Sequence, residues 1–146
     1  MKTQTYLLGA LFFVLTLSLA CSGGEGEPSA QDLAFENLSG SWDISQGGSI
    51  IIDGNNATAN FVGFALSFDE TGYNTLNAGE LFSATGTWTW ADEEAQQIDL
   101  DDGKRVTIES LTESEFVFSF QFSGAGGQAN LEESISGSYT ITVNKP

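Results

Sequence analysis

Short segments in which apolar and polar residues alternate recur from Gly40 to the C-terminus, and they constrain the fold more than any other feature of the chain. Alternation with a period of two places every second side chain on one face of a β-strand. The segments recur at roughly ten-residue spacing, which is typical of antiparallel all-β folds. We expect strands at residues 41–45, 49–52, 60–68, 72–76, 84–90, 96–100, 105–109, 115–122 and 138–143. The sequence therefore predicts an antiparallel meander of eight or nine strands, closed as a small barrel or a barrel-like sandwich.

Local signals define one helix and one tight hairpin. Ser29 is a good N-cap and Asp32 stands three residues on, which predicts a short helix at residues 29–38. Asp102-Gly103 between two alternating segments favours a hairpin turn, because such a pair tolerates positive φ. The acids around this turn lack the spacing and the distal Glu of a calcium loop, so we expect no metal and no cofactor.

Large aromatic side chains dominate the expected inner faces of the strands. They either pack as a core or line an apolar pocket, and packing is the default interpretation for rings of this size. Trp88 and Trp90 share a strand face opposite a row of threonines, which favours burial of both; if exposed, they would suit sugar stacking. The residues expected to line the core or a pocket are Phe64, Phe68, Trp88, Trp90, Phe116, Phe118, Phe120 and Phe122.

The N-terminus has the features of an export signal. Lys2 precedes an apolar run at residues 6–20, which as a helix would span roughly 22 Å, short of the ~30 Å hydrocarbon core of a bilayer. Ser18-Leu19-Ala20-Cys21 resembles the lipobox of bacterial lipoproteins, and this resemblance implies a lipid anchor on Cys21. An ordinary secretory signal is the alternative. We expect a signal peptide at 1–20, a lipidated cysteine and acidic Gly-rich tether at 21–31, and a barrel domain at 32–146.

The charge and the composition of the chain argue against nucleic-acid binding and against catalysis. The chain carries 4 Lys+Arg against 20 Asp+Glu and no His, a net charge of −16. Removal of Lys2 with the signal leaves three cations against the same 20 acids, or −17. Nucleic acid is a poor partner, because binding to phosphates needs Lys and Arg. Without His, and with Cys21 assigned to lipidation, the usual nucleophile–base pairs are missing, so we expect a protein that is not an enzyme.

A resemblance to a known family covers most of the mature chain. The segment Leu38-Ser39-Gly40-Ser41-Trp42 has the G-x-W form that opens lipocalin-type barrels. The order of signal, cysteine, acidic tether, G-x-W, a Gly86-Thr87-Trp88 block and a closing Gly137-Ser138-Tyr139 resembles the lipocalin-like lipoproteins of Bacteroidota. The resemblance implies that Gly40 and Trp42 close one end of a barrel. It also implies a late Arg or Lys over the tryptophan, for which the chain offers Arg105 in mid-chain and Lys145 next to the end.

These observations predict a non-catalytic protein anchored by lipid to the outer membrane, on its periplasmic or its cell-surface side. The expected role is binding of a small apolar ligand inside the lipocalin-like barrel. Two alternatives are an accessory subunit of an outer-membrane protein complex, recruited through its acidic face, and a surface carbohydrate-binding module that uses exposed aromatic rings. A cavity lined by Phe would favour the first role, a filled core with an exposed apolar patch the second, and exposed Trp and Tyr the third.

Overall fold

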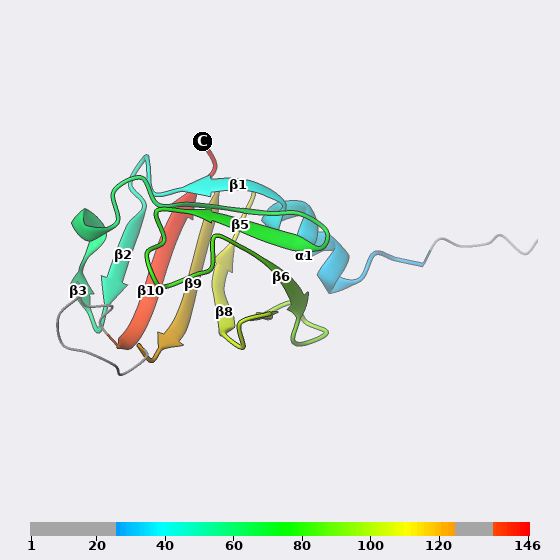
Figure 1. Cartoon of the computed structure of the whole chain (residues 1–146). Coiled ribbons are helices and arrows are strands. Elements are labelled where there is room, and N and C mark those ends of the chain that lie inside the picture. The colour runs from blue at the N-terminus through cyan, green and yellow to red at the C-terminus, as the bar shows by residue number, and fades with distance from the viewer. Residues whose placement is uncertain (1–25, 125–135) are drawn as a thin grey trace, which may run out of the picture.

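A computed structural model of the chain describes residues 26–124 and 136–146 and consists mostly of strands (Figure 1). In these ranges no helix is long and apolar enough to span a bilayer. The elements are α1 (Ala30–Leu38), β1 (Gly40–Asp43), β2 (Ser49–Ile52), β3 (Asn55–Asn56), the 3-10 helix η1 (Thr58–Asn60), β4 (Ala65–Phe68), β5 (Gly72–Leu76), β6 (Thr85–Trp90), β7 (Gln97–Leu100), β8 (Arg105–Leu111), β9 (Glu115–Phe122) and β10 (Gly137–Asn144).

The strands form a closed antiparallel barrel. From β4 to β10 each strand pairs with the next along the chain. On its other edge β4 pairs with β1, and β1 reaches β10 through the pair Asp43–Asn144, which closes a ring of eight strands. β2 and β3 extend the sheet from β10 as two additional strands. The predicted fold class is confirmed, and of the two expected forms the barrel is the one observed.

One long first strand is broken into β1 and β2. Both run antiparallel to β10 and so continue in the same direction, with residues 44–48 bulging out between them. Gly48 makes this bulge possible, because a Cβ at that position would lie 2.6 Å from the Ile44 Cα and 2.7 Å from the Thr142 carbonyl oxygen. Backbone atoms cannot move aside as a flexible side chain can, so only glycine fits there.

The strand expected at residues 60–68 is shorter than predicted. Only Ala65–Phe68 is strand, and the residues before it form the end of η1 and a turn. Gly63 adopts a φ of +74°, and the Asn77 side-chain amide donates to the carbonyl oxygens of Val62 and Gly63. This turn rotates Val62 outward, where it is 76% exposed, although the alternating pattern had placed it on the same face as Phe64. The two-residue β3 was also not expected.

The predicted helix and hairpin are confirmed. The Ser29 hydroxyl accepts from the Asp32 backbone N–H and the Asp32 carboxylate accepts from the Ser29 N–H, which is a complete capping box at the start of α1. The helix begins two residues before the expected domain boundary at 32. Gly103 adopts a φ of +85° in the turn between β7 and β8, and its N–H donates to the Leu100 carbonyl oxygen.

Trp42 closes the end of the barrel on which α1 lies, here termed the α1 end. Its side chain is fully buried, its Nε1–H donates to the Leu38 carbonyl oxygen at 2.8 Å, and its ring centroid lies 5.7 Å from that of Phe116. The Lys145 Nζ lies over the indole, 4.9 Å from the ring centroid, so Lys145 and not Arg105 covers Trp42. Gly40 adopts a φ of +110°, and a Cβ at this position would lie 4.0 Å from the Lys145 Cε, so the backbone of Gly40 lies beside the Lys145 side chain.

We predict that Trp42→Ala destabilises the fold by about 3–5 kcal/mol, because it removes a fully buried ring and leaves a cavity. Lys145→Met, which keeps the aliphatic contact and loses only the charge, should cost about 0.5–1 kcal/mol. Urea denaturation followed by circular dichroism measures both. An unchanged midpoint for Trp42→Ala would contradict the closing role of this residue.

Candidate functional site

The interior of the barrel is packed with aromatic rings. Ring stacking continues along β9 and on to β10, with centroids 4.6 Å apart for Phe116–Phe118 and 5.2 Å apart for Phe120–Tyr139. The cavity left among these side chains is about 20 Å³, room for about one water molecule. Of the expected lining residues, Phe64, Trp88, Phe116, Phe118 and Phe120 are buried, and Phe68, Trp90 and Phe122 are partly buried against the core. These rings are therefore part of the core in the structure described, and Trp88 and Trp90 also border a groove on the outside of the barrel.

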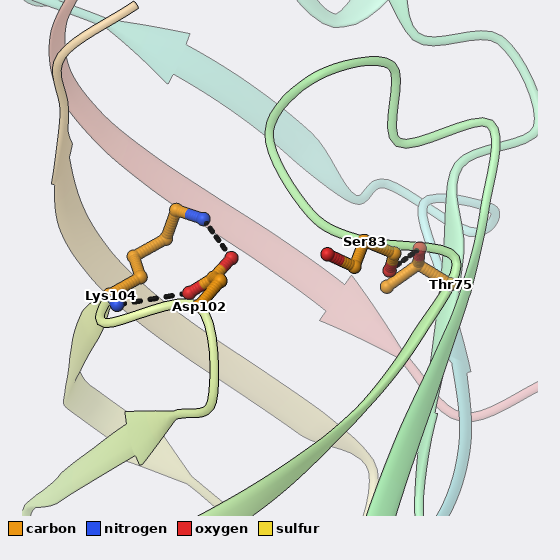
Figure 2. Close-up of polar contacts among 4 residues, drawn as sticks. All are labelled: Thr75, Ser83, Asp102 and Lys104. Carbon is orange, nitrogen blue, oxygen red and sulfur yellow. Dashed lines mark hydrogen bonds and ion pairs between the residues drawn. The ribbon is translucent and has the colours of Figure 1, made fainter.

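The end of the barrel opposite α1 is closed by a loop and a lysine. Leu81 and Phe82, from the segment between β5 and β6, are buried in the barrel mouth. The Lys104 Nζ lies 5.1 Å from the Phe82 ring centroid and 2.7 Å from the Asp102 carboxylate, so the ammonium group covers the plug. In Figure 2, this ion pair faces the segment held by the hydrogen bond from the Thr75 hydroxyl to the Ser83 carbonyl oxygen. Sequence reasoning did not find this plug, because Leu81 and Phe82 belong to no alternating strand.

A groove opens on the outside of the barrel between α1 and β6. It has a volume of about 400 Å³, within the range of about 300–1,000 Å³ that small-molecule sites occupy. Phe35 of α1 stacks on Trp88 of β6 with centroids 6.0 Å apart, and Trp90 stands perpendicular to Trp88 at 5.1 Å. These three rings form an aromatic floor. The residues lining what we term the α1–β6 groove are Gln31, Asp32, Phe35, Glu70, Trp88, Thr89 and Trp90.

Three local structures hold the groove in shape. The Gln31 amide donates to the Asp92 carbonyl oxygen at 2.8 Å, which fastens the first turn of α1 to the connection between β6 and β7. The Trp88 indole N–H donates to the Asp69 carbonyl oxygen at 3.0 Å. The Asp69 carboxylate in turn accepts from the backbone N–H of Gly72, so the β4–β5 turn that presents Glu70 is itself ordered.

The groove is negative and its surroundings offer no compensating cation. Asp32 and Glu70 lie on its rim, and hydrogen bonds from Ser29 hold the pKa of the Asp32 carboxyl below its ordinary value. Three of the four Lys and Arg residues lie in the part of the chain that the structure describes, and each is engaged elsewhere. Lys104 and Lys145 cover aromatic rings at the two ends of the barrel, and Arg105 forms a two-point ion pair with Asp99 at 2.7 Å.

Metal ligands do not converge within the part of the chain that the structure describes. No group of three or more acidic, His or Cys side chains there is close enough to hold an ion. Asp99, one of the acids near the Asp102-Gly103 turn, forms an ion pair with Arg105. A second outer hollow of about 350 Å³ crosses β8, β9 and β10, and its lining is mainly polar, with Phe120 as its one aromatic ring.

The structure brings together some of the residues singled out from the sequence and leaves others apart. Trp88 and Trp90 share a face as expected, but only Trp88 is buried, at 7% exposure, whereas the edge of Trp90 reaches the surface. Phe35, Gln31 and Glu70 were not singled out, because a helix and a turn far apart in sequence carry them. Cys21 lies outside the described residues.

Comparison with protein-family models, with curated proteins and with solved structures finds no match to this chain.

We predict a pH-dependent contribution from the turn that presents Glu70. Hydrogen bonds from the Thr71 and Gly72 amides hold the pKa of the Asp69 carboxyl below its ordinary value of 3.8. A lowered pKa means that the ionised group stabilises the fold above the ordinary value, and that this stabilisation is lost as the pH falls through the lowered pKa. Asp69→Asn should therefore lower the urea midpoint at neutral pH, with a gap to the native protein that narrows below pH 3.8. A gap that acidification leaves unchanged would contradict this role.

Proposed function

We propose that the protein is a non-catalytic binding protein, anchored to the outer membrane through lipid on Cys21, that takes its ligand in the α1–β6 groove. The observation that carries the proposal is the contrast between a barrel interior with about 20 Å³ of free space and an outer groove of about 400 Å³ with an aromatic floor. A ligand needs both space and side chains that reward desolvation, and the groove has both.

The position of the groove suits an anchored protein. Gln31 and Asp32 of the groove lie in the first turn of α1, where the expected tether at residues 21–31 meets the barrel domain. The segment from Cys21 to Ser29 can extend to at most roughly 30 Å, so a lipid on Cys21 would keep the groove near the membrane surface. A diacylated or triacylated cysteine anchors stably, whereas a single chain gives only marginal binding.

The anchor is tested by Cys21→Ser. We expect this variant to leave the membrane fraction, because the acylated residue is removed while the described barrel is untouched. Fractionation of cells followed by immunoblotting measures the result. Cys21→Ser protein that stays in the membrane fraction would sink the lipid-anchor proposal.

The binding site is tested by native mass spectrometry on protein gently extracted from its own membranes. We expect a bound small-molecule mass that Trp90→Ala loses and that Val62→Ala, which changes an exposed side chain outside the groove, retains. Co-purifying protein at fixed stoichiometry with no bound small molecule would instead favour the accessory-subunit role and overturn the groove proposal.

A second candidate function is binding of a small apolar ligand inside the barrel. The supporting observation is that loop residues, Leu81 and Phe82, plug the barrel mouth, so that displacement of one segment would enlarge the cavity. In the same experiment, a bound mass that Trp90→Ala retains and that is released only on unfolding would favour this interior site over the groove.

A further inference from the structure

We propose that the α1–β6 groove recognises an organic cation, an alkylated ammonium group, which sits on the aromatic floor with the Glu70 carboxylate as its counter-ion. The inference rests on the proposed function, because it names the chemical class of the ligand for the same groove. It follows from three observations: the arrangement of the rings, the charge of the rim and the absence of a convergent metal-ligand set in the described residues.

The rings of the floor have the arrangement that cation recognition uses. An alkylammonium group is attracted to the negative face of an aromatic ring, most strongly to Trp, and is less strongly hydrated than a metal ion. Trp88 and Trp90 meet at an interplanar angle of 89°, and Trp90, the more exposed of the two, offers its ring to a cation in the groove. Phe35 extends the floor from the α1 side.

The rim supplies a counter-ion that the fold does not use. The Asp32 carboxylate is occupied with the N–H and hydroxyl of Ser29. Glu70, by contrast, is exposed and forms no hydrogen bond or ion pair with another described residue. No Lys or Arg lines the groove, and the net charge of the mature chain attracts cations from a distance.

Other ligand classes fit this groove less well. A divalent metal ion needs several converging oxygen ligands, and the described residues provide no such group. An anion would meet two carboxylates and no cation. A neutral sugar would stack on the rings and donate hydroxyl hydrogen bonds to the rim, but it would form no ion pair there, so its binding should be insensitive to added salt.

The experiment titrates the detergent-solubilised full chain with choline, with its neutral isostere 3,3-dimethylbutan-1-ol and with methyl glucoside, by calorimetry. We expect choline to bind about tenfold more tightly than the isostere, and to weaken as salt is added. Glu70→Gln should weaken choline binding by roughly three- to tenfold. The matched control Glu113→Gln, which removes the same charge from the β8–β9 turn outside the groove, should change it by less than about twofold.

Variants of Trp90 test whether the affinity for choline depends on the aromatic floor. Trp90→Ala should weaken choline binding by more than about tenfold, whereas Trp90→Phe, which keeps a ring, should retain most of it. Should Trp90→Ala fail to fold, the comparison of Trp90→Phe with Glu70→Gln still decides the question.

Two sets of outcomes separate the inference from the proposed function. Equal affinity for choline and its isostere, no effect of Glu70→Gln, or preferential binding of the glucoside would overturn the cation inference. The groove proposal would survive these results as long as Trp90→Ala loses the mass bound in native spectra. Failure of choline to bind, together with a native ligand that Trp90→Ala retains, would overturn both.

Discussion

The packing of Trp42 is the interaction on which the rest of the structure depends. Its indole donates to the Leu38 carbonyl oxygen, contacts Phe116 and lies under the Lys145 ammonium. These contacts join the end of α1, β1, β9 and the C-terminal residues at the point where the barrel closes. Because the end of α1 is fixed there, the same face of the helix is held beside β6 through Phe35, and the α1–β6 groove follows from how the barrel is closed.

The two ends of the barrel are covered in different ways and leave different amounts of free volume. Each aromatic core end is covered by a lysine, Lys104 over Phe82 and Lys145 over Trp42, in a chain that has few cations to use. At the Lys104 end a loop fills the mouth and leaves almost no free volume. At the α1 end the helix covers the mouth from outside and leaves a groove beside it. The larger free volume therefore lies outside the barrel and not in its interior.

Most of the fold could be predicted from the sequence, because the alternation of apolar and polar residues within each strand shows which of its faces is buried. The capping box of α1 and the Gly103 turn were equally local and were equally well predicted. The prediction of strand for the residues before β4 was wrong, because the turn at Gly63 depends on a hydrogen bond from Asn77, which is distant in sequence. The groove could be predicted only in part. The strand pattern identified Trp90 as a candidate lining residue. Glu70 is one acid among 20, and its place in the groove could not be predicted, because it depends on barrel closure bringing the β4–β5 turn beside α1.

A two-dimensional NMR spectrum that resolves the three tryptophan indole N–H signals tests most directly whether the ligand binds outside the barrel, at the α1–β6 groove. Two of these groups, in Trp42 and Trp88, donate to backbone carbonyl oxygens, and Trp42 lies at the barrel closure, away from the groove. We expect addition of choline to shift the Trp90 and Trp88 signals and to leave the Trp42 signal unchanged. A shift of Trp42 and of the core methyl groups of Ile141 and Val143, with Trp90 unchanged, would contradict this expectation.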